Sequence, residues 1–137
     1  MNRKDFQGLE ATRLNEAKVL LKSGHYSGAY YLAGYVVECA LKACIAKQTR
    51  RHDFPDRDKW AEIFVHDLTK LMKIAGLQPT LDAEIKTDAT FADNWNAVKD
   101  WREISRYGKT SQSEAEALIR AISDSRNGVL RWLKRHW

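Results

Sequence analysis

The stretch from Tyr26 to Cys44 constrains the fold of this chain most, because it combines helical periodicity with a nearly continuous apolar or small surface. The residues that step by four and three positions along it are Tyr26, Tyr30, Ala33, Val37, Ala40 and Cys44. This spacing places them on one face of an α-helix. The other positions between Ala29 and Val37 are also apolar or small. A helix that is apolar on several faces has to be enclosed by other elements, so we expect it to be the central helix of the protein.

Helical periodicity elsewhere predicts three further main helices around this one. A first helix is expected from about Arg3 to Lys22, and Ser23-Gly24 leaves so short a gap that the first two helices should form an antiparallel hairpin. The remaining expected segments are a third helix from Val65 to Ala75, a fourth from Phe91 that stops near Gly108, and a last helix from a capping box at Ser111–Glu114 almost to the end. Short helical stretches are expected around Lys59–Phe64 and within Gln78–Ala89. The prediction is an all-α, antiparallel up-and-down four-helix bundle with one or two short extra helices.

The length of 137 residues allows one core, so residues 1–137 are predicted to form a single domain. Two prolines and seven glycines are too few for a sheet protein that needs many tight turns. No uninterrupted apolar run approaches about 18 residues, which argues against a membrane span. The first residues, Met1 to Phe6, are polar and unlike a secretion signal. We therefore expect a cytoplasmic protein without a membrane segment.

The only two cysteines, Cys39 and Cys44, are five positions apart on the central helix. That spacing separates them by about 140° around the helix axis, which disfavours a disulfide or shared metal ligation within the helix. Buried free thiols are the expected state. The sequence also lacks H-E-x-x-H, C-x-x-C, E-x-x-H and any glycine-rich phosphate loop, so neither a metal nor a cofactor is predicted.

Polar residues at helical spacing mark the candidate site. Glu38 and Lys42 lie one turn apart on the most apolar helix, where they must pair with each other or with further charges. Such a pair often does no more than fix helix register. Arg102 and Arg106 share a face of the fourth helix beside Tyr107. Two neighbouring arginines suit a phosphate, but they equally suit a carboxylate across the bundle.

Histidine is the usual general base near neutral pH, and His66 is the best placed of the four histidines. It opens the predicted third helix beside Asp67, Thr69 and Lys70. A structural role for His66 remains an alternative to a catalytic one. The other three, His25, His52 and His136, are expected on the surface, in a loop and at the terminus. The net charge of +5 is compatible with a phosphate-bearing partner without requiring one.

Three segments, in this order, resemble the HEPN domain family. Gly24 to Ala43, which contains Glu38-x-x-Leu41-Lys42, is similar to the family's signature helix. His66 to Leu71 resembles the H-x-L-x-x-L start of its third helix, and Trp101 with Arg106-Tyr107 resembles its aromatic segment followed by R-Y. Together with the final helix, the resemblance covers essentially the whole chain. It implies an all-α bundle that usually dimerises, with its functional groups near the dimer interface.

The HEPN resemblance implies a short list of functions. The family includes RNA-cutting toxins, partners of small nucleotidyltransferases, and members of uncertain role. Its nucleases use an arginine followed four to six residues later by a histidine, whereas no histidine follows Arg106 at that spacing. Arg131 and His136 have the spacing, but about one such coincidence is expected by chance among the 4 histidines and many arginines of this chain.

The first hypothesis is therefore a homodimeric HEPN-like protein that binds RNA, a nucleotide or a partner such as a nucleotidyltransferase, as part of a toxin–antitoxin or stress-response pair. The residues expected to line its polar site are Glu38, Lys42, His66, Lys70, Arg102, Arg106 and Tyr107. One alternative is a metal-independent ribonuclease in which His66 is the base and Arg102 or Arg106 holds the phosphate. Another is a structural dimerisation module, in which these residues only hold the bundle together.

Overall fold

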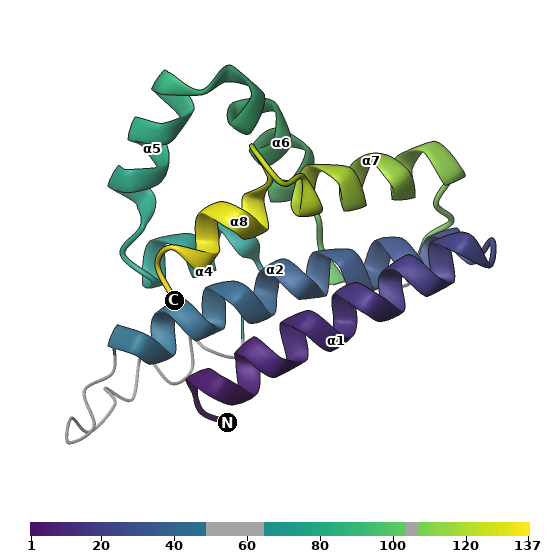
Figure 1. The fold of residues 1–137 in the computed structure, drawn as a ribbon, viewed down its shortest axis with the longest axis horizontal. Coiled ribbons are helices and arrows are strands. Elements are labelled where there is room, and N and C mark those ends of the chain that lie inside the picture. Colours follow the sequence, from purple (N-terminus) through teal and green to yellow (C-terminus); the bar gives the residue numbers. More distant parts are fainter. Residues whose placement is uncertain (49–64, 104–106) are drawn as a thin grey trace.

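The computed structural model describes residues 1–48, 65–103 and 107–137, and the predicted all-α fold is confirmed throughout these ranges (Figure 1). Its helices are α1 (Arg3–Lys22), α2 (Tyr26–Gln48), α4 (Leu68–Ile74), α5 (Gln78–Thr87), α6 (Ala89–Lys99), α7 (Gln112–Ser123) and α8 (Val129–Lys134). The helix expected around Lys59–Phe64 lies outside the described residues.

Helices α1 and α2 form the predicted antiparallel hairpin, and Figure 1 shows them side by side along the longest axis of the molecule. Asn2 and Asp5 form a capping box at the start of α1, in which each side chain accepts a hydrogen bond from the other residue's backbone amide. After the C-cap Ser23, Gly24 has a φ of +82°. Glycine adopts this left-handed conformation without steric cost, so α2 can begin only two residues later.

Helix α2 is the central element of the bundle, as its sequence predicts. Most of its residues from Ala33 to Ile45 are buried beneath α1, α4, α7 and α8. Among the described helices, α2 alone is long and apolar enough to span a bilayer, and 67% of its apolar window is buried inside the protein. Enclosure by other helices explains this apolar character, as in the core helix of a soluble protein.

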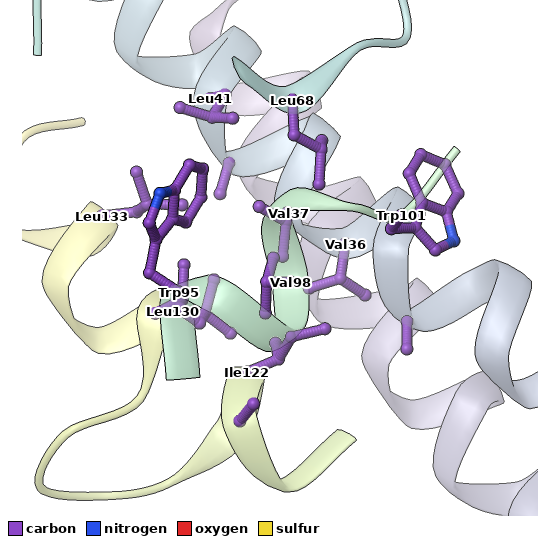
Figure 2. Packing of buried hydrophobic residues seen from close by; sticks show 14 of the residues in the cluster. Val36, Val37, Leu41, Leu68, Trp95, Val98, Trp101, Ile122, Leu130 and Leu133 are labelled. Atoms are coloured by element: carbon purple, nitrogen blue, oxygen red, sulfur yellow. The ribbon is translucent and has the colours of Figure 1, made fainter. Parts of the chain in front are cut away.

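The hydrophobic core collects side chains from both halves of the sequence around α2 (Figure 2). Val36, Val37 and Leu41 of α2 lie among residues of the later helices. Those labelled in Figure 2 are Leu68, Trp95, Val98, Trp101, Ile122, Leu130 and Leu133. Helices α4, α7 and α8 pack directly against α2, and α6 packs on α7 and α8, so polar groups near the ends of these helices are brought close to α2.

The predicted last helix is interrupted, which corrects the sequence expectation. Helix α7 ends at Ser123 and α8 begins at Val129. Between them, Asp124 Oδ1 accepts hydrogen bonds from the backbone amides of Arg126 and Asn127, at 2.8 and 2.7 Å. Side chains of this kind compete with the helical hydrogen bonds, and the local turn is formed instead.

Three other boundaries differ from expectation, and at two of them, the starts of α4 and α6, an aspartate caps the helix. The weakly patterned stretch 78–89 holds α5, ten residues long, and Asp88 then caps α6 by accepting from the amide of Phe91. Helix α6 stops at Lys99 rather than near Gly108. Helix α4 starts at Leu68 rather than at Val65, since Asp67 is its N-cap.

Both cysteines are buried and free, as expected. Burial raises the pKa of Cys39 to about 11, with the charge of Glu38 adding to the effect, and burial also raises the pKa of Cys44 to about 11. At pH 8 only about one thiol in a thousand is then ionised. We expect a chromogenic disulfide reagent to label neither thiol in the native protein at pH 8 and to label both in denaturant. Rapid labelling of the native protein would contradict the burial of these residues.

Candidate functional site

The candidate site is built on Glu38, a carboxylate in the middle of the apolar helix α2. Its side chain is 1% exposed. Glu38 Oε1 lies 2.8 Å from Lys42 Nζ, one turn later on the same helix, and 2.8 Å from His66 Nδ1, which comes from the segment before α4. Glu38 Oε2 has no hydrogen-bond partner within the described part of the chain. Lys42 and His66 are the partners that this buried carboxylate needs, because an unpaired buried charge is costly.

His66 connects this buried carboxylate to the protein surface. Its side chain is 41% exposed, and its Nε2 lies 3.3 Å from Glu103 Oε2, in the segment that follows α6. Both ring nitrogens therefore face carboxylate oxygens.

A second contact runs alongside the first and joins the same two segments. Arg102 Nη2 lies 3.8 Å from Asp67 Oδ2, within ion-pair range but longer than a hydrogen bond. The consecutive residues His66 and Asp67 thus pair with the consecutive residues Glu103 and Arg102. We call these two contacts the crossed ion pairs.

Asp67 has a structural role besides its contact with Arg102. Its Oδ1 caps α4 by accepting from the backbone amides of Thr69 and Lys70 and, at 2.6 Å, from the Thr69 hydroxyl. The hydrogen bond from the Thr69 hydroxyl is the main cause that lowers the pKa of Asp67 below its usual range. Asp67 is therefore kept ionised, with Oδ1 holding the helix start and Oδ2 turned toward Arg102.

The segment carrying Arg102 and Glu103 is anchored by Trp101. Trp101 is fully buried and lies against α2 at Gly34, where an added Cβ would come within 2.0 Å of the indole ring. The ring of Tyr31 is 6.0 Å away, centroid to centroid. Glycine at position 34 therefore lets the indole pack directly on the helix backbone, which fixes the start of the segment that reaches His66.

The structure brings together four of the seven predicted site residues: Glu38, Lys42 and His66 directly, and Arg102 through Asp67. Lys70 lies exposed in the first turn of α4. Tyr107 is 76% exposed, and Arg106 lies outside the described residues.

The remaining histidines take no part in this cluster where they can be placed. His25 is exposed at the turn before α2, and His52 lies outside the described residues. His136 packs edge-on against Trp132, and burial lowers its pKa. The glutamate at 103 and the anchoring role of Trp101 were not predicted, although the aromatic residue directly before an arginine and a glutamate was visible in the sequence.

The chemistry available at the cluster is that of charge and hydrogen bonding. In the ranges the structure describes, no group of three or more His, Cys, Asp or Glu side chains could hold a metal ion. The exposed cations are Lys70 and Arg102, and both acids of the crossed ion pairs are partly exposed. An anion can therefore bind to the cations of the cluster by displacing the carboxylate of Glu103 or Asp67.

Fold and site together define a class of protein, a small all-α bundle whose central apolar helix carries a buried Glu–Lys pair. A histidine just before α4 contacts this pair, and an arginine after α6 contacts the neighbouring aspartate. The family model for the HEPN domain matches residues 11–136, nearly the whole chain, and the protein belongs to this family. Membership supports a nucleotide- or RNA-related function in general terms. Neither a curated protein nor a solved structure matches the chain significantly.

Proposed function

We propose that this HEPN protein acts by binding a phosphate-bearing ligand, RNA or a nucleotide, at the cluster of Glu38, Lys42, His66 and Arg102. Family membership supports the class of ligand. Both ring nitrogens of His66 already lie near carboxylate oxygens, at 2.8 and 3.3 Å, which supports a role in binding, because a general base has to be within reach of the proton that it abstracts.

Within this proposal the buried and exposed residues have different tasks. Glu38 and Lys42, with side chains 1% and 12% exposed, hold His66 in place. Arg102, 48% exposed, and the exposed Lys70 contact the phosphate. Arginine suits this task because its planar guanidinium can donate two parallel hydrogen bonds to one phosphate.

The ligand phosphate takes the place of the Glu103 and Asp67 carboxylates in the crossed ion pairs. Exposed ion pairs of this kind are worth only about 0–1 kcal/mol, so exchanging them costs little. An RNA phosphodiester carries the same single negative charge as a carboxylate, and its oxygens are the same kind of acceptor for His66 and Arg102. We expect binding to weaken steeply with added salt, as it does wherever phosphates are neutralised by basic side chains.

The Arg102→Ala variant tests this proposal. Losing one charge-assisted contact should weaken binding of a short single-stranded RNA by about tenfold or more, with unchanged helicity. Fluorescence anisotropy at fixed, low ionic strength measures the affinity, and circular dichroism measures the helicity. Arg120→Ala is the matched control, because Arg120 is an exposed arginine on α7 away from the cluster. Equal losses in both variants would point to unspecific charge attraction and contradict the proposed site.

One observation supports the ribonuclease alternative. The longer contact of His66 is with Glu103, which is more exposed than Glu38. A ligand that displaced Glu103 would free Nε2. Incubating the protein with total RNA in the presence of a chelator separates the two functions. Binding alone leaves the RNA intact, whereas cleavage by the wild type that disappears in His66→Ala would establish the ribonuclease.

The wider context that we propose is the one that the HEPN resemblance implies. We propose a cytoplasmic homodimer that works with a partner protein, such as a nucleotidyltransferase, in a toxin–antitoxin or stress-response pair. A dimer would bring two copies of the cluster to one particle. Light scattering of the purified protein measures the mass, and co-expression with the neighbouring gene product tests the pairing.

A further inference from the structure

A hollow of about 310 Å³ lies between α1 and the corner where α7 turns into α8. None of the residues that line it belongs to the cluster around Glu38. Its apolar lining is Leu14, Ile122 and Leu130, of which the last two are buried. We call this hollow the corner groove.

The corner groove combines its apolar lining with cations. Lys18 of α1 and Arg131 and Lys134 of α8 line it, and all three are exposed. Asp124 is the acid in the lining, so the lining carries two more positive than negative charges. The Oδ1 of Asp124 accepts from the amides of the turn, and hydrogen bonds from these amides lower its pKa.

The cations of the groove retain donors for a ligand. Arg131 uses Nη1 to donate to the carbonyl oxygen of Arg126, at 2.7 Å. A guanidinium carries five N–H groups, so most of its donors stay available. The hydroxyl of the exposed Ser125 also borders the groove.

A buried carboxylate forms an ion pair with Lys134, one of the residues that line the groove. Glu10 of α1 is 2% exposed, and its Oε1 has no hydrogen bond among the residues that the structure describes. Its nearest cation is Lys134, whose Nζ lies 3.6 Å from that oxygen and 5.4 Å from the centre of the Trp137 ring. Burial raises the pKa of Glu10, which shows that the site is unfavourable for its charge. A buried carboxylate without a hydrogen bond is rare and often has a functional role. Here Glu10 can hold the ammonium group of Lys134 at the groove.

We propose that the corner groove binds an organic phosphate monoester. The phosphate lies against Arg131 and Lys18, with Lys134 completing the positive field. The organic part lies on the partly exposed Leu14, above the buried Ile122 and Leu130. The assignment rests on the combination of excess positive charge and an apolar lining, since a bare anion would use only the first. It is independent of the proposed function at Glu38.

Isothermal titration calorimetry with phenyl phosphate and with inorganic phosphate tests this assignment. We expect phenyl phosphate to bind more tightly, because its ring covers the apolar lining. Arg131→Ala should weaken phenyl phosphate binding by about tenfold or more, and Lys18→Ala by a few-fold. Lys22→Ala is the matched control for Lys18, being an exposed lysine one turn further along α1. It should change the affinity by less than about twofold.

Any of the following three results would overturn the proposal. Absence of saturable binding at millimolar phenyl phosphate would show that the groove takes no such ligand. Equal affinities for the two probes would mean that the apolar lining contributes nothing. Loss of binding in Arg102→Ala, with Arg131→Ala unaffected, would place the ligand at the cluster around Glu38 instead.

Discussion

Glu38→Ala is expected to lower the free energy of unfolding by about 3–5 kcal/mol, the usual cost of breaking a buried ion pair by removing one partner. The loss is large because Glu38 Oε1 serves both Lys42 and His66, and Lys42 is only 12% exposed. Without the carboxylate, an ammonium is left largely buried and unpaired. Urea denaturation at pH 7, followed by circular dichroism, measures the change.

Two further variants separate this effect from a general loss of charge. Glu103→Ala removes the other carboxylate that contacts His66, but at an exposed pair, so we expect a loss below about 1 kcal/mol. Glu38→Leu combined with Lys42→Met replaces the buried pair with apolar side chains and should recover much of the stability. If Glu38→Ala proved no more harmful than Glu103→Ala, the buried pair would not hold this part of the bundle together.

Gly34→Ala is expected to destabilise the protein by about 3 kcal/mol or more, although alanine is the better helix former. The added Cβ would lie 2.0 Å from the indole of Trp101, which is itself fully buried and has little room to move. Displacing this ring would also displace Arg102 and Glu103. RNA binding should therefore weaken in Gly34→Ala even at temperatures where the variant remains folded, as measured by anisotropy.

Gly8→Ala is the control for the helix-forming effect of the substitution. Gly8 lies inside α1, and a Cβ there meets no atom within 4 Å. Alanine should raise stability at this position by about 0.5–1 kcal/mol. The two glycine variants thus have opposite expected signs, and thermal unfolding compares them directly. A stabilised Gly34→Ala variant would mean that Trp101 does not pack against α2 as described.

The parts of the fold that the sequence predicts well are those set by local signals. The bounds of α1, the glycine turn at Gly24 and the apolar faces of α2 each depend on residues within one or two turns of each other. The break between α7 and α8 was missed because apolar residues continue at helical spacing through Ile122 and Val129. The helix breaks because Asp124 Oδ1 accepts hydrogen bonds from the following backbone amides, and such a bond leaves no trace in the spacing of apolar residues.

The candidate site was only partly predictable for a related reason. Glu38 and Lys42 are neighbours on one helix, so their pairing follows from sequence spacing. The contact of His66 with Glu38 and the crossed ion pairs depend on how α4 and the segment after α6 pack against α2. From the sequence, either a phosphate or a carboxylate could be the partner of Arg102. In the structure Arg102 lies within ion-pair range of the Asp67 carboxylate.

The central claim is that charges from three separate segments form one site that binds RNA. Amide chemical shifts of ¹⁵N-labelled protein, followed while a short single-stranded RNA is added, test it most directly. We expect the largest changes to fall on Thr69, Lys70, Arg102 and Glu103, on either side of the crossed ion pairs. Changes confined to other surfaces of the bundle, or none at saturating RNA, would contradict it.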